Sequence, residues 1–206
     1  MTPFHKTLRF TTLLFGVVLI GMVVWRFTHP MTARLIVDQP TMDYGSVTDF
    51  SLTDRSGKTV RRADLNGRWW VADFVFTRCM GPCPMITTNM SRLQSEFSGK
   101  KNLRFVSFTV DPDYDTPAVL TMYAANYGAN PDRWYFLTGP KKTIFDLIHG
   151  SFKLAVEPQA GPPTETDILH SLSLVLVDPE SHIRGYFNST DPNAVARLKD
   201  ELKKLS

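Results

Sequence analysis

The two cysteines of this 206-residue chain, Cys79 and Cys83, lie four positions apart in the stretch FTRCMGPCPM, and there are no others. Residues at this spacing share one face of a helix, so the two thiols could form a disulfide or grip one small ion together. A helix N-terminus favours thiolates, which are soft ligands suited to Cu(I) or zinc. The loop they would close is too small for a structural disulfide to stabilise the fold much. The spacing therefore favours a redox or metal-binding pair over a staple.

The elements next to the cysteines must position them. Residues 69–76, WWVADFVF, form a continuous apolar run with one acid, which is typical of a strand buried on both faces. After the cysteines, apolar residues recur at spacings of four, three and four, which predicts the core stripe of an amphipathic helix: Ile86, Met90, Leu93 and Phe97. The dithiol is therefore expected at a strand-to-helix turn, where Pro82 and Pro84 are tolerated because the first helical turn has no N–H bond to lose.

The rest of the chain continues the alternation of strands and helices. Strands are predicted at 103–110 and 134–137, with a hairpin at 172–187, and helices after Pro117, at 141–149 and after Pro192. Asp115 or Thr116 is the expected N-cap of the helix after Pro117, and Asp191 caps the last helix. This order predicts an α/β fold of the thioredoxin-like kind, a mixed sheet flanked by helices on both faces.

Two further residues could act with the thiols. His170 heads the apolar strand SLSLVLVD, roughly where thioredoxins place a cis-proline facing the dithiol, which makes it a candidate third metal ligand. Asp73 shares a strand face with Val71 and Val75, and an acid there is costly unless it is paired, hydrogen-bonded or protonated. It is either a polar core residue hydrogen-bonded to a neighbouring loop or a proton acceptor for the second thiol, which is what its resemblance to the buried aspartate of thioredoxins, at the same offset before the first cysteine, implies.

The N-terminal region predicts a membrane anchor. An uncharged, mostly apolar stretch at residues 10–25 lies between Lys6 and Arg9 on one side and Arg26 on the other, and no A-x-A-like cleavage site follows it. We expect a tail at 1–9, an uncleaved transmembrane signal anchor at 10–27, a linker at 28–41 and a single domain at 42–206 outside the cytoplasm. A cleaved signal peptide is the alternative. The net charge is only +3 and the basic residues form no stripe, which argues against nucleic-acid binding.

Several long motifs in order resemble the Sco/SenC family, the membrane-anchored thioredoxin-like proteins linked to copper delivery for cytochrome c oxidase assembly. They are FTRCMGPCPM, MSRLQ, VSFTVDPDYDTPAVLTMYA, DRWYFLTG, LHSLSLVLVD and IRGYF. The resemblance implies copper, as Cu(I) or Cu(II), held by Cys79, Cys83 and His170. The chain departs from the family between the cysteines, where Met-Gly-Pro replaces the usual acid-containing triplet.

The expected function is that of a copper chaperone for the copper-site subunit of cytochrome c oxidase or a similar copper protein. The alternative is a thiol-disulfide reductase that keeps the partner's metal-binding cysteines reduced. In that case Cys79 would attack, Cys83 would resolve and Asp73 would manage the proton. With its anchor, the expected location is a bacterial inner membrane with the domain on the periplasmic face.

Overall fold

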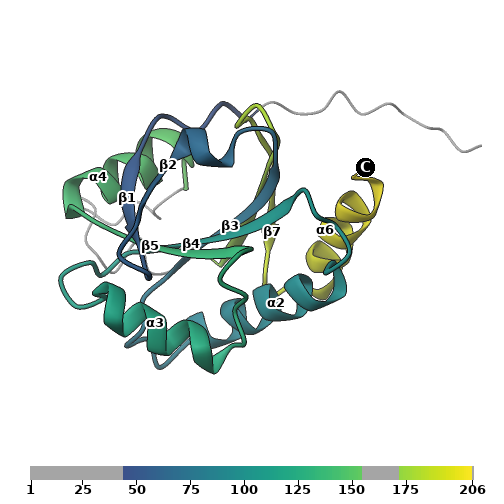
Figure 1. Cartoon of the computed structure of the whole chain (residues 1–206). Helices are drawn as coiled ribbons and strands as arrows, with labels where there is room; N and C mark the ends of the chain where they lie inside the picture. The colour runs from purple at the N-terminus through teal and green to yellow at the C-terminus, as the bar shows by residue number, and fades with distance from the viewer. Residues whose placement is uncertain (1–43, 155–171, 206) are drawn as a thin grey trace, which may run out of the picture. The chain divides into compact units, whose positions relative to one another are not determined.

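A computed structural model describes residues 44–154 and 172–205 of the chain (Figure 1). Its strands are β1 (Ser51–Asp54), β2 (Thr59–Arg61), β3 (Trp69–Val75), β4 (Leu103–Thr109), β5 (Trp134–Thr138), β6 (Ser173–Val177) and β7 (Ile183–Asn188). Its helices are η1 (Arg62–Leu65), α2 (Cys83–Glu96), α3 (Pro117–Asn126), α4 (Lys141–Asp146), η2 (Leu147–Ser151) and α6 (Pro192–Lys204).

One seven-stranded sheet has the order β2-β1-β5-β4-β3-β6-β7. The neighbours β3, β4 and β5 run parallel, while β6 is antiparallel to β3 and β7 antiparallel to β6. β3 is an interior strand between β4 and β6, so its C-terminal end lies among the ends of its neighbours and not at an outer strand of the sheet. The expected thioredoxin-like mixed sheet is confirmed for the described part of the chain.

Most predicted elements are present close to their expected bounds, and the differences are local. Thr116 caps α3 by accepting a hydrogen bond from the Val119 amide, so the neighbouring Asp115 is not the cap. The predicted helix at 141–149 is α4 followed by the wider turn η2. The β1–β2 hairpin was not predicted, because its strands of four and three residues are too short to show a clear alternation.

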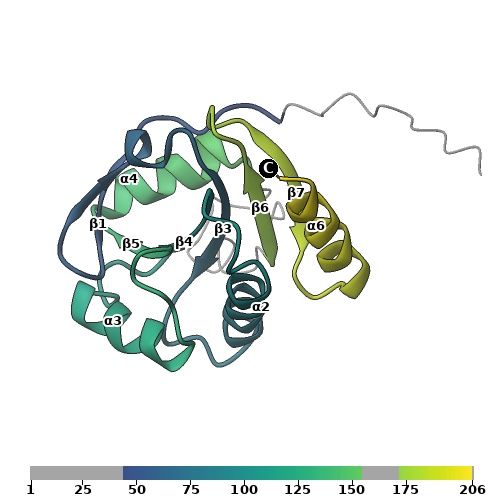
Figure 2. The same ribbon diagram turned by 45° about the vertical axis from the view of Figure 1, so that its right-hand side comes forward.

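Helices cover both faces of the sheet, as Figures 1 and 2 show. Alternate residues of β3 enter two separate cores. Trp70 and Ala72 pack on the side of α4 and η2, whereas Val71 packs with the apolar stripes of α2, α3 and α6. The predicted stripe of α2 lies in this second core, where Ile86, Met90 and Leu93 are buried. Asp73 follows Val71 on the same strand face and therefore lies beneath these helices.

Three expectations fall on residues that the structure does not describe. The anchor at 10–27, the linker at 28–41 and the candidate ligand His170 all lie outside the described ranges. Among the residues that are described, no helix has the length and apolar character needed to span a bilayer.

Candidate functional site

The two cysteines lie on either side of the junction between β3 and α2. Residues 76–82, here called the dithiol loop, connect the end of β3 at Val75 to the start of α2 at Cys83. Within the loop the Cys79 amide donates a hydrogen bond to the Phe76 carbonyl at 3.2 Å. Pro82 occupies the N-cap position and Pro84 the first turn of α2, where a missing amide donor costs nothing. The predicted strand-to-helix turn is therefore confirmed, with one change: Cys79 precedes the helix instead of lying on it.

The two thiols are free and differ in their environments. Cys83 is buried, with 2% of its surface exposed, while Cys79 is partly exposed. Their side chains are close enough for Cys79 to help raise the pKa of the Cys83 thiol. A pair with one accessible and one buried sulfur can present Cys79 to a partner while Cys83 stays behind it. Such an arrangement is suited to exchange with another protein and does not act as a structural staple in this state.

Burial sets the protonation of Cys83. It raises the pKa of the thiol to about 12, chiefly because the charged form loses its hydration, and secondarily because of Cys79 and the negative charge of Asp73. A hydrogen bond with the Phe76 backbone opposes the shift only in part. The helix N-terminus was expected to favour the thiolates, whereas burial of Cys83 acts in the opposite direction and favours the neutral thiol. A metal ion or a proton acceptor is needed to ionise this sulfur at neutral pH.

Asp73, the candidate proton acceptor in the sequence, is fully buried in the sheet beneath α2. Burial raises its pKa to about 7, while Ser107 on the paired residue of β4 acts in the opposite direction. Within the described part of the chain neither carboxylate oxygen has a well-formed hydrogen bond. Hydrogen bonding to a neighbouring loop, the structural interpretation of Asp73, thus has no support among these residues. An unpartnered carboxyl that titrates near neutrality beside a buried thiol can accept its proton.

A layer of uncharged polar groups surrounds this pair. The Trp134 indole donates to the Ser107 hydroxyl at 2.9 Å. On α2, the buried Thr87 hydroxyl lies 2.9 Å from the Cys83 carbonyl and 2.8 Å from the Tyr123 hydroxyl. Burial raises the pKa of Tyr123, so this phenol stays neutral and its hydroxyl remains a hydrogen-bond donor. Neutral dipoles of this kind allow the thiols to lose and regain a proton without a fixed counter-ion.

Sequence reasoning missed a second group of residues, which holds the dithiol loop. The buried carboxylate of Asp115 accepts hydrogen bonds from the Thr77 hydroxyl and amide, and Asp111 forms an ion pair with Arg78. The Arg78 guanidinium also lies 4.3 Å from the centre of the Tyr114 ring. The signal available in the sequence was the run of acids in DPDYDTP, of which only the helix cap was used.

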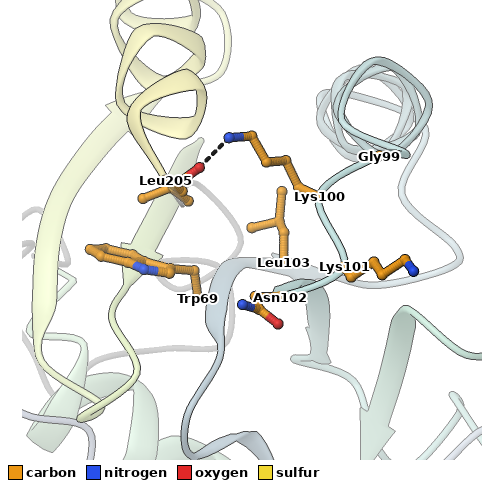
Figure 3. Close-up of a pocket in the computed structure, with 7 residues that line it drawn as sticks. All are labelled: Trp69, Gly99, Lys100, Lys101, Asn102, Leu103 and Leu205. Carbon is orange, nitrogen blue, oxygen red and sulfur yellow. Dashed lines mark hydrogen bonds between the residues drawn. The ribbon is translucent and has the colours of Figure 1, made fainter.

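Other candidate groups do not extend the site within the described residues. In residues 44–154 and 172–205 no group of three or more histidine, cysteine or acidic side chains is arranged so that it could hold a metal ion, and His170 lies outside these ranges. His182 lies at the β6–β7 turn beside Asp178, at the end of β6 remote from the dithiol. A surface pocket of about 210 Å³ lies at the start of β3 and β4, as Trp69 and Leu103 mark in Figure 3, and is also remote from the dithiol.

Methionines next to the cysteines are unusually exposed. Met80 is 99% exposed in the dithiol loop and Met85 is 45% exposed in the first turn of α2. Apolar side chains at such positions remain in water unless another surface covers them. Both flank the accessible sulfur without contributing to either core of the domain.

Comparisons with known proteins agree with this geometry. A family model described as SCO1/SenC matches residues 39–205. The SCO1 protein homolog of Bacillus subtilis is 33% identical over 162 residues, which cover 78% of this chain and 82% of that protein. A Stutzerimonas stutzeri protein named for copper binding is 27% identical over 146 residues, or 70% of each chain. The solved structure of BsSco, a member of the Sco family of cytochrome c oxidase assembly proteins, superposes with a TM-score of 0.66 at 32% identity over 79% of this chain and 93% of that one. This chain belongs to the SCO1/SenC family.

Proposed function

We propose that this chain binds copper with Cys79, Cys83 and His170 and delivers it to a copper site of cytochrome c oxidase or of a similar copper protein. The observation that carries the proposal is the pair of free thiols at the end of the central strand, one accessible and one buried. Thiolates with an imidazole form a soft donor set suited to Cu(I), and the same set also accepts Cu(II). The names of the S. stutzeri relative and of BsSco support copper binding and oxidase assembly as the context.

The direction of β6 supports His170 as the third ligand. Because β6 runs antiparallel to β3, its first residue, Ser173, lies at the end of the sheet where β3 finishes and the dithiol loop begins. The carbonyl of Leu172 accepts a hydrogen bond from the Ser189 amide, and the Ser189 carbonyl in turn accepts one from the Asn89 side chain of α2. The described chain therefore resumes next to α2, only two residues after His170.

The raised pKa of Cys83 shapes how copper is held. Copper must displace the proton of this thiol, so binding releases a proton and strengthens as pH rises. The accessible Cys79 is the ligand that a partner can reach first, because Cys83 is buried. A three-coordinate site of this kind can open toward an incoming sulfur ligand without unfolding the domain.

The second candidate function is disulfide reduction, and Asp73 is the observation that favours it. The Cys79 thiolate would attack one sulfur of a partner disulfide, forming a mixed disulfide and releasing the other partner sulfur as a thiolate. Asp73 would take the proton of Cys83, whose thiolate would then attack the Cys79 sulfur and release the second partner thiolate. The chain ends oxidised by two electrons and the partner ends reduced by two. A reductase of this kind would keep the cysteines of the partner ready for copper.

The place of action that we propose follows the N-terminal segment. Residues 10–27 would anchor the chain in a bacterial inner membrane, and the domain would face the periplasm. A copper site on the outer side of the membrane would then be within reach of the dithiol.

Anaerobic titration of the reduced protein with Cu(I) tests the leading function. We expect one Cu(I) per chain and a marked loss of affinity in His170→Ala. His182→Ala is the matched control, since that histidine lies at the opposite end of β6. Equal affinities in the wild type and His170→Ala would remove His170 from the site, and copper retention after Cys83→Ser but not Cys79→Ser would indicate a different ligand set.

The two functions predict defects of different variants in different assays. A chaperone should lose oxidase assembly under copper limitation on His170→Ala while still reducing a model disulfide. A reductase should be slowed near neutral pH by Asp73→Asn and tolerate His170→Ala. A strain with normal oxidase activity in His170→Ala and a defect in Asp73→Asn would eliminate the chaperone proposal.

A further inference from the structure

The carboxylate of Asp115 joins three segments of the chain at the dithiol end of the sheet. Its side chain is fully buried. One oxygen lies 2.5 Å from the Thr77 hydroxyl, and the other 2.5 Å from the Thr109 hydroxyl and 3.2 Å from the Thr77 amide. Thr77 belongs to the dithiol loop, Thr109 ends β4, and Asp115 itself lies two residues before α3. Both oxygens of this buried charged group therefore accept hydrogen bonds, which join separate segments at the dithiol end of the sheet.

Helix capping does not explain why an acid stands at this position. Thr116 performs that role, and the Asp115 side chain turns instead toward the loop that precedes Cys79. Burying a carboxylate is costly unless specific donors compensate it, so the three donors and the acid form a matched set. The Thr109 hydroxyl also accepts a hydrogen bond from the Asp111 amide, which links the same set to the ion pair of Asp111 with Arg78.

The dithiol loop has few other constraints on its conformation. Residues 76–81 lie outside the ladders of β3, and only Pro82, at the end of the loop, accepts hydrogen bonds from the first turn of α2. Within the loop, the backbone supplies the Cys79–Phe76 hydrogen bond described above. Helix α2 fixes the position of Cys83, whereas the position of Cys79 depends on the contacts made by residues 77 and 78. The separation of the two sulfurs therefore depends on the contacts of Thr77 and Arg78, and Thr77 has the buried partner.

We propose that Asp115 is a positioning residue of the dithiol, which acts through Thr77 to keep the Cys79 sulfur beside that of Cys83. Asp115 touches neither sulfur. Its effect is to raise the effective concentration of one thiol at the other, on which both disulfide formation and two-sulfur metal binding depend. The effect on copper binding rests on the proposed function, whereas the effect on disulfide formation does not.

The equilibrium of the full chain with glutathione measures this effect without copper. In that reaction the two thiols are oxidised to one disulfide while one glutathione disulfide is reduced to two glutathione thiols, so electrons and protons balance. Thr77→Val removes the hydroxyl donor at nearly constant shape, and we expect it to lower the equilibrium constant about tenfold. Thr77→Ser restores the donor and should recover most of the constant. Asp115→Asn should shift it in the same direction as Thr77→Val.

Thr48→Val is the matched control for a general loss of stability. The Thr48 hydroxyl lies 2.6 Å from that of Ser151, near the β6–β7 turn at the opposite end of the sheet. We expect this variant to lower the unfolding midpoint without changing the glutathione equilibrium. A change in Thr77→Val no larger than that in Thr48→Val, or no recovery in Thr77→Ser, would overturn the proposal. A chain that binds no Cu(I) but shows the predicted glutathione shift would refute the proposed function and leave the positioning role of Asp115 intact.

Discussion

The buried carboxyl of Asp73 should make the stability of the reduced domain fall as pH rises. Its pKa is 3.8 in an unfolded chain and about 7 in the folded protein. Between these values the folded state holds a proton that the unfolded state has lost, so the free energy of unfolding decreases with pH. A shift of about three units corresponds to roughly 4 kcal/mol once pH exceeds the folded pKa. Below pH 4 this loss of stability is absent.

Asp73→Asn removes this titration. The amide of asparagine also lacks partners and carries a cost of its own, of about 1–3 kcal/mol, but that cost does not depend on pH. We therefore expect the stability of Asp73→Asn relative to the wild type to rise by up to about 4 kcal/mol between pH 4 and pH 8. The neighbouring Cys83 and Tyr123 have raised pKa values and stay neutral over this range, so neither contributes to the difference.

Urea unfolding of the reduced protein, followed by the fluorescence of the buried Trp70 and Trp134, measures this difference at each pH. Asp132→Asn is the control for an acid-to-amide change outside the core, because this acid is exposed. A constant difference between Asp73→Asn and the wild type from pH 4 to pH 8 would refute the reasoning, since it would mean that the carboxyl ionises as readily in the fold as in water.

Three further predictions concern the dithiol and the anchor. Alkylation of the reduced protein near neutral pH should modify Cys79 much faster than Cys83, because only Cys79 is accessible; equal rates by mass spectrometry would contradict the burial of Cys83. Arg78→Ala should shift the glutathione equilibrium less than Thr77→Val does, because the pair with Asp111 is largely exposed on the arginine side; a larger shift would make this ion pair the main anchor of the loop. N-terminal sequencing of the mature protein should find the chain uncleaved, and a start beyond residue 25 would establish a cleaved signal peptide.

Local patterns in the sequence were sufficient to place the dithiol. The apolar run of β3, the stripe at Ile86, Met90 and Leu93 and the two prolines each report on neighbours within a few residues, where periodicity and backbone geometry act directly. The same reasoning placed Asp73 on the strand face of Val71, which packs beneath α2 in the structure. It could not identify the β1–β2 hairpin, because short strands are stabilised by the sheet they join and not by their own pattern.

The sequence by itself determined which groups stand at the strand-to-helix turn, namely two sulfurs with a carboxyl in the strand before them. Only the tertiary structure decided how they differ. It buries Cys83 and leaves Cys79 accessible, leaves Asp73 without a hydrogen bond among the described residues, and turns Asp115 from a helix cap into a partner of Thr77, 38 residues earlier. Burial and long-range hydrogen bonds depend on segments that meet only when the sheet and its helices assemble, and no local pattern in the chain encodes them.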